Sequence, residues 1–284
     1  MDDTVLLTTT APTPDEVVAV AREGRPVRLD DASRAAIADG RERVAAMAAD
    51  PEPTYGVSTG FGALATQFIP AEKRAALQRS LIRSHAAGSG PAVEPEVVRA
   101  MMLLRLRTIA TGRTGVRPEV AGLLAGLLDA GITPVVHEYG SLGCSGDLAP
   151  LSAVALCLMG EGEAARPDGT VGPAADVLAE AGLAPVSLVE KEGLALINGT
   201  DGMLGMLLLA IHDLERLVRV ADVAAAISVE AQLGTDRVFA AELQELRPHP
   251  GQAASASNLR RLMDGSGIVA SHRTPDCNRV QDAY

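Results

Sequence analysis

One stretch of the sequence, from Gly199 to Leu233, contains no proline and repeats apolar residues at helical spacing. The repeated positions are Leu204, Leu207, Leu208, Ile211, Leu214, Leu217, Val218 and Ala221. This pattern predicts one helix of about 30 residues, well above the mean helix length of roughly 12. Its segment from Met203 to Ile211 is apolar on nearly every side, whereas a surface helix carries a polar face. The chain must therefore enclose this helix in a bundle, formed within one chain or between several.

Helical patterns also cover much of the preceding sequence. We expect a helix that begins at about Asp31 and further helices over residues 71–87, 94–110, 118–130 and 151–159. Residues 1–30 are expected to form extended segments, and residues 51–70 and 131–150 to be irregular and glycine-rich. Aromatic residues make up only 2% of the chain, which argues against an all-β sandwich or barrel. The expected fold class is mainly α.

The size and charge of the chain limit its domains and partners. A length of 284 residues makes one large domain or two ordinary ones. A net charge of −11 without any basic run excludes the electrostatic footprint of a nucleic-acid-binding protein. Three cysteines without a CxxC pair are typical of reduced thiols in a cytosol, and the acidic start lacks the pattern of a signal peptide. The apolar run GMLGMLLLAI ends at His212 and Asp213, too short to span a bilayer, so we expect a cytoplasmic chain with no membrane partner.

Two glycine-rich motifs match signatures of other enzyme classes. Residues 60–65 match the dinucleotide fingerprint GxGxxA, but Pro70 stops any following helix and no acidic residue stands about 20 positions further on. Residues 56–60 match the GxSxG motif of serine hydrolases, but their flanks predict neither the strand nor the helix that this motif needs. A Walker loop is excluded because no Gly-Lys pair occurs, and the five histidines are too scattered to predict a metal site.

A third glycine-rich stretch, GSLGCSGDLAPL at residues 140–151, allows a different chemistry. It contains the tripeptide Cys144-Ser145-Gly146. Gly146 has no Cβ, so the backbone can bend until its nitrogen approaches the carbonyl carbon of Cys144. Ring closure and the loss of two waters, one of them from the Ser145 side chain, would give a 4-methylideneimidazol-5-one. No ordinary side chain provides such an electrophile.

Six segments carry a resemblance to a known family. They are YGVSTGFG at 55–62, SHAAGSGP at 84–91, GSLGCSGDLAPL at 140–151, LMGEGEA at 158–164, EGLALINGT at 192–200 and NRVQDAY at 278–284. In these segments and in their order, the sequence resembles the aromatic amino acid ammonia-lyase family, from about residue 10 to its last residue. The resemblance implies an N-terminal region with the cofactor loop, followed by a bundle of long helices.

The resemblance also implies an activity, a cofactor and site residues. The reaction is the removal of ammonia from L-histidine, which leaves trans-urocanate, with a 4-methylideneimidazol-5-one made from Cys144, Ser145 and Gly146. Tyr55 corresponds to the base that takes the β-proton, and a phenol can act so only where its surroundings favour the phenolate.

Four further residues take roles from the same resemblance. His85 would hydrogen-bond the imidazole of the substrate, and the pair Ser84-His85 separates the histidine enzyme from its phenylalanine relatives. Asn198 corresponds to the amide that polarises the cofactor's carbonyl oxygen. Gln281 and Tyr284 correspond to the later active-site pair, with Tyr284 counted as catalytic. Asp147 is expected to cap the helix that follows it.

The chain departs from the family pattern at its end, since the family continues well past Tyr284. We therefore expect a fragment of a longer protein, rather than a truncated form with little lyase activity. Residues 1–198 would be the cofactor-loop region and residues 199–284 the start of the helix bundle. The family assembles as a homotetramer whose active sites draw on several subunits, which fits the apolar half of the long helix. Two alternatives stay open: a phenylalanine or tyrosine ammonia-lyase or aminomutase, and a catalytically inactive helical scaffold.

Overall fold

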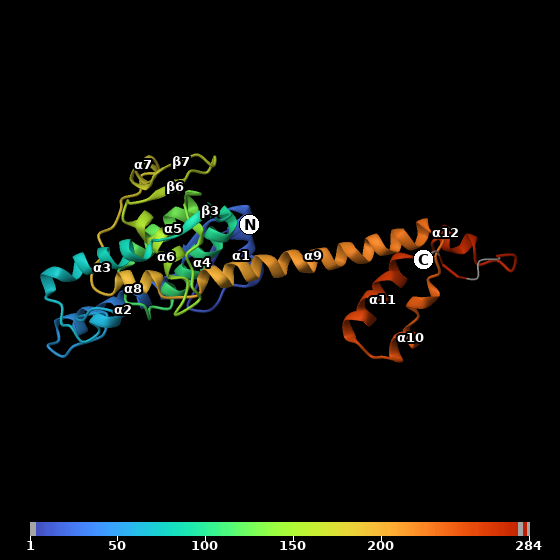
Figure 1. Cartoon of the computed structure of the whole chain (residues 1–284), viewed down its shortest axis with the longest axis horizontal. Helices are drawn as coiled ribbons and strands as arrows, with labels where there is room; N and C mark the ends of the chain where they lie inside the picture. Colours follow the sequence, from blue (N-terminus) through green and yellow to red (C-terminus); the bar gives the residue numbers. More distant parts are fainter. Residues whose placement is uncertain (1–3, 278–280, 283–284) are drawn as a thin grey trace. The chain divides into compact units, whose positions relative to one another are not determined.

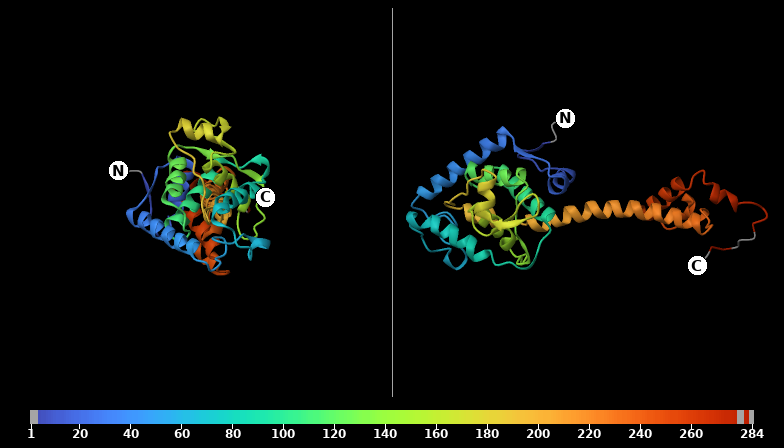
Figure 2. Two further views of the ribbon diagram at one scale, coloured as in Figure 1. Left: turned by 90° about the vertical axis from the view of Figure 1, so that its left-hand side faces the viewer. Right: turned by 90° about the horizontal axis from the view of Figure 1, so that it is seen from above.

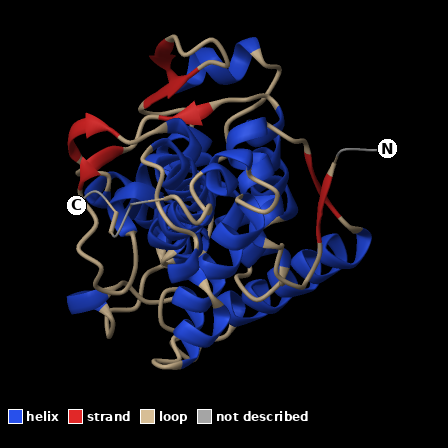
Figure 3. Ribbon diagram, turned by 90° about the vertical axis from the view of Figure 1, so that its right-hand side faces the viewer, coloured by secondary structure: helices blue, strands red, loops and turns tan. Residues whose placement is uncertain are grey.

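The computed structural model describes residues 4–277, 281 and 282. The chain divides into two compact units, Met1–Ala210 (unit 1) and Ile211–Tyr284 (unit 2). Most of the described residues in both units are helical, and the strands are few and short (Figure 3). The expected fold class, mainly α, is confirmed.

The described helices of unit 1 that precede the long helix are α1 (Pro14–Val18), the π-helix η1 (Ala19–Glu23), α2 (Asp31–Ala49), the 3₁₀-helix η2 (Gly62–Leu64), α3 (Ala71–His85), α4 (Pro95–Ala110), α5 (Pro118–Asp129), α6 (Leu148–Leu158), α7 (Ala174–Glu180) and α8 (Glu192–Ile197). The sequence predicted α2, α3, α4, α5 and α6 and missed the shorter ones. The prediction of extended structure throughout residues 1–30 was wrong, because α1 and η1 lie there. Thr13 forms a capping box with Glu16, and Pro14 occupies the first turn.

Helix α4 is the central helix of unit 1. Its residues Met101, Met102, Leu103, Leu106 and Ile109 are almost completely buried. Helices α1, α2 and α5 and the π-helix η1 pack against it (Figure 1). A helix enclosed on all sides in this way shows no polar face in its sequence.

Three small sheets complete unit 1. The parallel pair β1 (Val5–Leu7) and β2 (Val27–Leu29) lies near the N-terminus, and β4 (Thr133–Pro134), β6 (Glu163–Ala165) and β7 (Val171–Pro173) form an antiparallel sheet. The antiparallel pair β3 (Ser89–Ala92) and β5 (His137–Tyr139) matters most for the site. It places the segment 84–91 beside the start of the segment 140–151.

The long helix predicted over residues 199–233 is α9, Asp201–Ala231, and it is uninterrupted in Figure 1 and in the right-hand view of Figure 2. In unit 1 its residue Leu209 is buried, and the backbone of Gly205 lies against Ala100 of α4. Many of its large apolar side chains are exposed in this chain: Met203, Leu204, Met206, Leu207, Ile211, Leu214, Leu217, Val218, Val220, Val223 and Ile227. The expected enclosing bundle is therefore not completed by the described residues.

The stretch 192–231, which includes α9, is the one helical segment among the described residues that is long and apolar enough to cross a membrane by length and composition. The apolar run continues helically through His212 and Asp213, so the prediction that it is too short to span a bilayer was wrong. A buried helix of a core passes the same test, and 39% of the most apolar window is buried. The expectation of no membrane partner stays a prediction.

Unit 2 packs short helices onto the C-terminal part of α9. They are the 3₁₀-helix η3 (Arg237–Phe239), α10 (Ala241–Glu245), α11 (Pro250–Leu262) and α12 (Gly267–Ser271). Ala226 of α9 forms a small core with Leu259, Met263 and Val269. The predicted domain boundary at residue 198 stays a prediction.

Candidate active site

The tripeptide Cys144-Ser145-Gly146 lies in the loop between β5 and α6, with Cys144 and Ser145 exposed. Ser145 has a φ of 62° and Gly146 a φ of 121°. A side chain with a Cβ rarely adopts such a conformation, so Ser145 is held in a strained backbone by its surroundings. This strain is located at the residue whose side chain must dehydrate if the ring forms.

The backbone of Gly146 lies directly against the backbone of Gly199, in the turn between α8 and α9. A Cβ built on Gly146 would lie 2.3 Å from the carbonyl oxygen of Gly199, so only glycine fits. The next residue, Asp147, donates its backbone N–H to the same Gly199 oxygen at 2.7 Å. The C-terminal side of the tripeptide is thereby attached to the α8–α9 turn.

Asn198 contacts the tripeptide from the same turn. Its side-chain Nδ2 donates a hydrogen bond of 2.5 Å to the carbonyl oxygen of Ser145. A donor at this oxygen withdraws electron density from the Ser145 carbonyl and makes the adjacent Cα–H of Ser145 more acidic. Asn198 and Ser145 are thus brought together as the sequence predicted, across 53 positions of the chain.

Asp147 does not cap α6 with its side chain, and that prediction was wrong. Its carboxylate accepts one hydrogen bond from the Ser141 hydroxyl at 2.8 Å and one from the backbone N–H of Met203 at 2.9 Å. Met203 lies in the first turn of α9, so this buried carboxylate caps the longer helix, where the dipole favours negative charge. The loop that contains the tripeptide is therefore attached to the start of α9 as well as to the α8–α9 turn.

Arg105 of α4 and Asp201 of α9 form a buried ion pair beneath the α8–α9 turn. Arg105 Nη2 lies 2.6 Å from Asp201 Oδ2, and the side chains are 5% and 8% exposed. Arg105 Nη1 donates to the carbonyl oxygens of Ala195 and Asn198, at 2.9 and 3.2 Å. Burial lowers the pKa of the Arg105 guanidinium and raises the pKa of the Asp201 carboxyl, and the partner's charge opposes both shifts. Each charge therefore depends on the other to remain in this buried position.

His85 is the last residue of α3, and its loop lies beside the site loop. Its Nδ1 lies 2.9 Å from the carbonyl oxygen of Leu81 and 3.0 Å from the Ser84 hydroxyl. A Cβ built on Gly140 would lie 3.1 Å from the Cα of Gly88, so the two glycine-rich segments are in close contact. His85 is half-buried and leaves Nε2 for a ligand that reaches this loop.

Tyr55 lies in the irregular segment before α3 and is 54% exposed. Its ring packs edge-on against Phe61, with 6.2 Å between the ring centroids, and its hydroxyl lies 3.5 Å from the N–H of Gly62. A Cβ on the adjacent Gly56 would lie 3.2 Å from Leu194 of α8, so this segment reaches the helix whose C-cap is Asn198. Tyr55, His85, Asn198 and the tripeptide therefore all lie in unit 1, on segments linked through α8 and β3–β5.

The structure agrees with setting aside two motifs of other enzyme classes. Ser58, the central serine of GxSxG, is completely buried and accepts a hydrogen bond of 2.8 Å from the Thr54 N–H. The GxGxxA segment at 60–65 contains only the three-residue helix η2. Among the described residues, no group of three or more histidine, cysteine or carboxylate side chains has the arrangement of a metal site.

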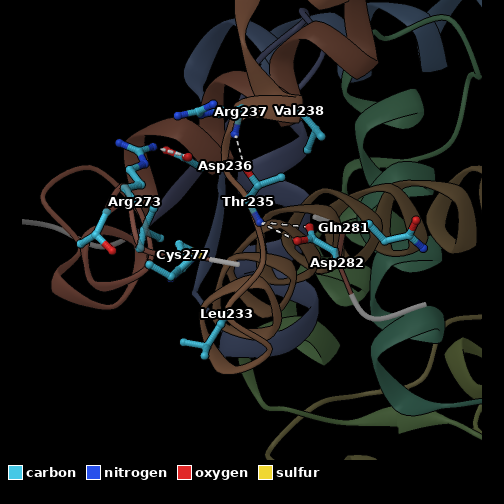
Figure 4. A pocket seen from close by; sticks show the side chains of 12 residues that line it. Leu233, Thr235, Asp236, Arg237, Val238, Arg273, Cys277, Gln281 and Asp282 are labelled. Carbon is cyan, nitrogen blue, oxygen red and sulfur yellow. Dashed lines mark hydrogen bonds and ion pairs between the residues drawn. The ribbon is translucent and has the colours of Figure 1, made fainter. Parts of the chain in front are cut away.

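Gln281 lies in unit 2, where it lines a pocket of about 480 Å³ (Figure 4). Thr235 and Asp282 line the same pocket, and the Thr235 N–H donates to the Asp282 carboxylate at 3.0 Å. Tyr284, the other residue of the predicted pair, lies outside the described residues. The roles of both stay predictions.

The profile of the family described as aromatic amino acid lyase matches residues 13–284, nearly the whole chain. The chain belongs to this family. The histidine ammonia-lyase of Streptomyces coelicolor is 62% identical over 99% of this chain and 55% of its own length. The histidine ammonia-lyase of Sorangium cellulosum is 52% identical over 93% of this chain and 52% of its own length. The chain thus spans about half the length of these curated relatives.

Solved structures of aromatic amino acid lyases and related aminomutases share the fold. The tyrosine aminomutase of Streptomyces globisporus matches with a TM-score of 0.87 and 41% identity, over 95% of this chain and 51% of its own. The histidine ammonia-lyase of Trypanosoma cruzi matches with a TM-score of 0.84 and 36% identity, over 90% of this chain and 49% of its own. The expected helical fold of the aromatic amino acid lyases is confirmed.

Aromatic amino acid lyases use a 4-methylideneimidazol-5-one, and the loop of this chain fits that group. Ser145 is exposed at a positive φ, Gly146 lies where no Cβ fits, and Asn198 donates to the oxygen that would become the ring carbonyl. The residues that would hold the ring are therefore Asn198, Gly199 and Asp147.

Two residues that hold this candidate site together were missed from the sequence. Arg105 stands in the apolar segment MMLLRLRTIA, and a charge in a segment so apolar signals a buried partner. Asp201 comes directly after the segment INGT, where an acidic residue is typical of an ordinary helix start. Their pairing was not visible because 96 positions separate them.

Proposed function

We propose that the complete protein containing this chain is a histidine ammonia-lyase, which converts L-histidine to trans-urocanate and ammonia. The observation that carries the proposal is the contact of Asn198 with Ser145 in a tripeptide whose backbone is strained. The curated relatives that are 62% identical and bear this name support the same substrate. The prosthetic group would be a 4-methylideneimidazol-5-one made from Cys144, Ser145 and Gly146.

The reaction is difficult because the β C–H of the substrate is a weak acid and its amine is a poor leaving group. The ring would supply an electrophile that eases both bond cleavages. Tyr55 is the base that removes the β-proton, and about half of this residue is exposed. His85 hydrogen-bonds the substrate imidazole, and Asn198 withdraws charge from the ring carbonyl. Gln281 and Tyr284 add substrate contacts, with Tyr284 also catalytic.

A second function is favoured by the structural match to a tyrosine aminomutase. The same tripeptide and tyrosine would serve a phenylalanine or tyrosine lyase or aminomutase, so the substrate is decided where its ring binds. The pair Ser84-His85 supports histidine, since His85 offers an imidazole that can hydrogen-bond a polar ring but gains nothing from a phenyl ring.

The test uses the protein at its full natural length with L-histidine, L-phenylalanine or L-tyrosine as the only substrate. Urocanate should accumulate from L-histidine, and His85→Phe should shift the preference toward L-phenylalanine. Conversion of L-tyrosine to a β-amino acid with no urocanate from L-histidine would overturn the proposal in favour of the aminomutase.

The third alternative, an inactive helical scaffold, is tested by the intact mass. The ring requires the loss of two waters, about 36 Da, from residues 144–146. A chain of unmodified mass in freshly prepared full-length protein would favour the scaffold.

We further propose that the protein works in the cytoplasm as a homotetramer. Support comes from the exposed apolar side chains of α9, which include Leu207, Leu214 and Leu217, because water-soluble proteins rarely leave such a stripe uncovered. Residues 199–284 would then begin the helix bundle, and residues 1–198 would carry the cofactor loop. Light scattering on the full-length protein tests this assembly, and a monomer would contradict it.

A further inference from the structure

The α8–α9 turn contacts the ring-forming tripeptide at two of its three residues. Asn198 donates to the Ser145 carbonyl oxygen at 2.5 Å, and Gly199 presses its carbonyl against Gly146. The turn contributes no atoms to the ring. Its position nevertheless decides whether these contacts form, so a residue that fixes the turn also acts on the tripeptide.

One guanidinium of helix α4 fixes this turn. Arg105 binds the carbonyl oxygens of Ala195 and Asn198 at the end of α8 and pairs with Asp201 at the start of α9. A Cβ on Gly199 would lie 2.0 Å from Arg105 Nη2, so the guanidinium lies directly against the residue that touches Gly146. Gly199 is therefore in close contact with both Arg105 and Gly146, and neither contact leaves room for a side chain.

Two steps of ring formation would be sensitive to these contacts. The nitrogen of Gly146 must form a bond with the Cys144 carbonyl carbon, and its hydrogen moves to that carbonyl oxygen. The resulting hydroxyl leaves as water with the amide hydrogen of Ser145, and the second water takes the Ser145 hydroxyl and its Cα hydrogen. The first step needs a short nitrogen-to-carbon approach, and the last needs a polarised Ser145 carbonyl.

We propose that Arg105, held by Asp201, is a positioning residue for ring formation: it presses the α8–α9 turn onto Cys144-Ser145-Gly146 and keeps the Asn198 amide on the Ser145 carbonyl. The proposal rests on the proposed function, because it presupposes that the ring forms. Arg105 touches neither substrate nor ring and acts through Asn198 and Gly199.

Arg105→Lys tests the proposal, because lysine keeps the charge but lacks the planar fork that binds two carbonyls and Asp201 together. Arg99 provides a matched control on the same helix. It is 7% exposed and donates to the carbonyl oxygens of Val20 and Leu128, away from the α8–α9 turn. Arg99→Lys therefore also removes a buried guanidinium and its hydrogen bonds to two carbonyl oxygens, but it does not alter the site.

The measurement follows the fraction of full-length chains that are about 36 Da lighter at fixed times after a short pulse of expression. Arg105→Lys should form the ring at least about tenfold more slowly than Arg99→Lys, at a similar melting temperature. The kcat per ringed chain should also fall in Arg105→Lys, with KM unchanged, because the Asn198 amide is displaced. Ring formation in both variants at the wild-type rate would overturn the proposal.

Asp201→Asn keeps the test decisive if Arg105→Lys does not fold. Asparagine retains the shape of the side chain and removes the charge that orients the guanidinium, so ring formation should again be slow in a folded protein. A folded Asp201→Asn protein with wild-type ring formation would contradict the positioning role. A wild-type protein that never loses the two waters would instead overturn the proposed function, and this inference with it.

Discussion

Gly146 and Gly199 lie back to back, and a Cβ on Gly146 would come within 2.3 Å of the Gly199 carbonyl oxygen. The two residues belong to segments that the sequence separates by more than 50 positions, and both segments carry residues assigned to the same chemistry. Their contact is the point at which the ring-forming loop meets the turn that carries Asn198. Substitutions here therefore report on ring formation before they report on turnover.

Gly146→Ala should abolish ring formation. A Cβ at a φ of 121° costs about 1–3 kcal/mol in backbone strain, and the clash with Gly199 displaces the loop. The intact mass should stay unmodified. Gly143→Ala is the control, since Gly143 also has a positive φ, 65°, but has open space where the Cβ would stand. That variant should lose about 1 kcal/mol of stability and still form the ring. Normal ring formation in Gly146→Ala would show that the close contact is not required.

Tyr55→Phe should remove the catalytic base without preventing formation of the prosthetic ring. The phenyl ring keeps the edge-on contact with Phe61, so folding and the mass loss should be unchanged. Loss of the hydroxyl should lower kcat by about 10²–10⁴-fold, the contribution typical of a positioned base. Tyr139→Phe, at another exposed tyrosine of unit 1, should leave kcat unchanged. A Tyr55→Phe enzyme with wild-type kcat would exclude Tyr55 as the base.

Asp147→Ala should destabilise the start of α9. It removes the buried carboxylate that accepts from the Met203 N–H and the Ser141 hydroxyl, which costs about 1–3 kcal/mol. Asp30 is the control, because it caps α2 from the surface through the Ser33 N–H at 2.7 Å. Asp30→Ala should cost about 1 kcal/mol and leave ring formation intact. Chemical denaturation measures both, and equal losses would argue against a special role for Asp147.

Cys157 should resist alkylation in the folded protein. Burial raises the pKa of its thiol from 9.0 to about 12, so the reactive thiolate is scarce at pH 8. Because the folded-state pKa is raised, the stability due to the neutral thiol is complete below pH 9 and is lost as the pH rises toward about 12. Iodoacetamide labelling followed by peptide mapping should modify Cys157 only after unfolding. Rapid labelling of Cys157 at pH 8 in folded protein would contradict its burial.

Local pattern predicted helices α2 to α6 and α9, because each is coded within one segment. Helices α4 and α5 begin at prolines and end within one residue of the expected positions. The early helices α1 and η1 were missed because they are short, and because residues 1–30 mix apolar and turn-forming residues. The predicted role of Asp147 was wrong because a capping residue in the sequence indicates only the helix that directly follows it. The carboxylate instead accepts from the N-terminus of a helix more than 50 positions later.

The sequence by itself determined the tripeptide, the tyrosine, the histidine and the asparagine, since each stands in a motif of its own and chemistry depends on residue type. Only the tertiary structure decided that Asn198 contacts Ser145, that Gly199 faces Gly146, and that Arg105 and Asp201 hold the turn between them. The physical reason is distance along the chain: hydrogen bonds and ion pairs act over about 3 Å, and no local pattern records which remote segment will fill that space.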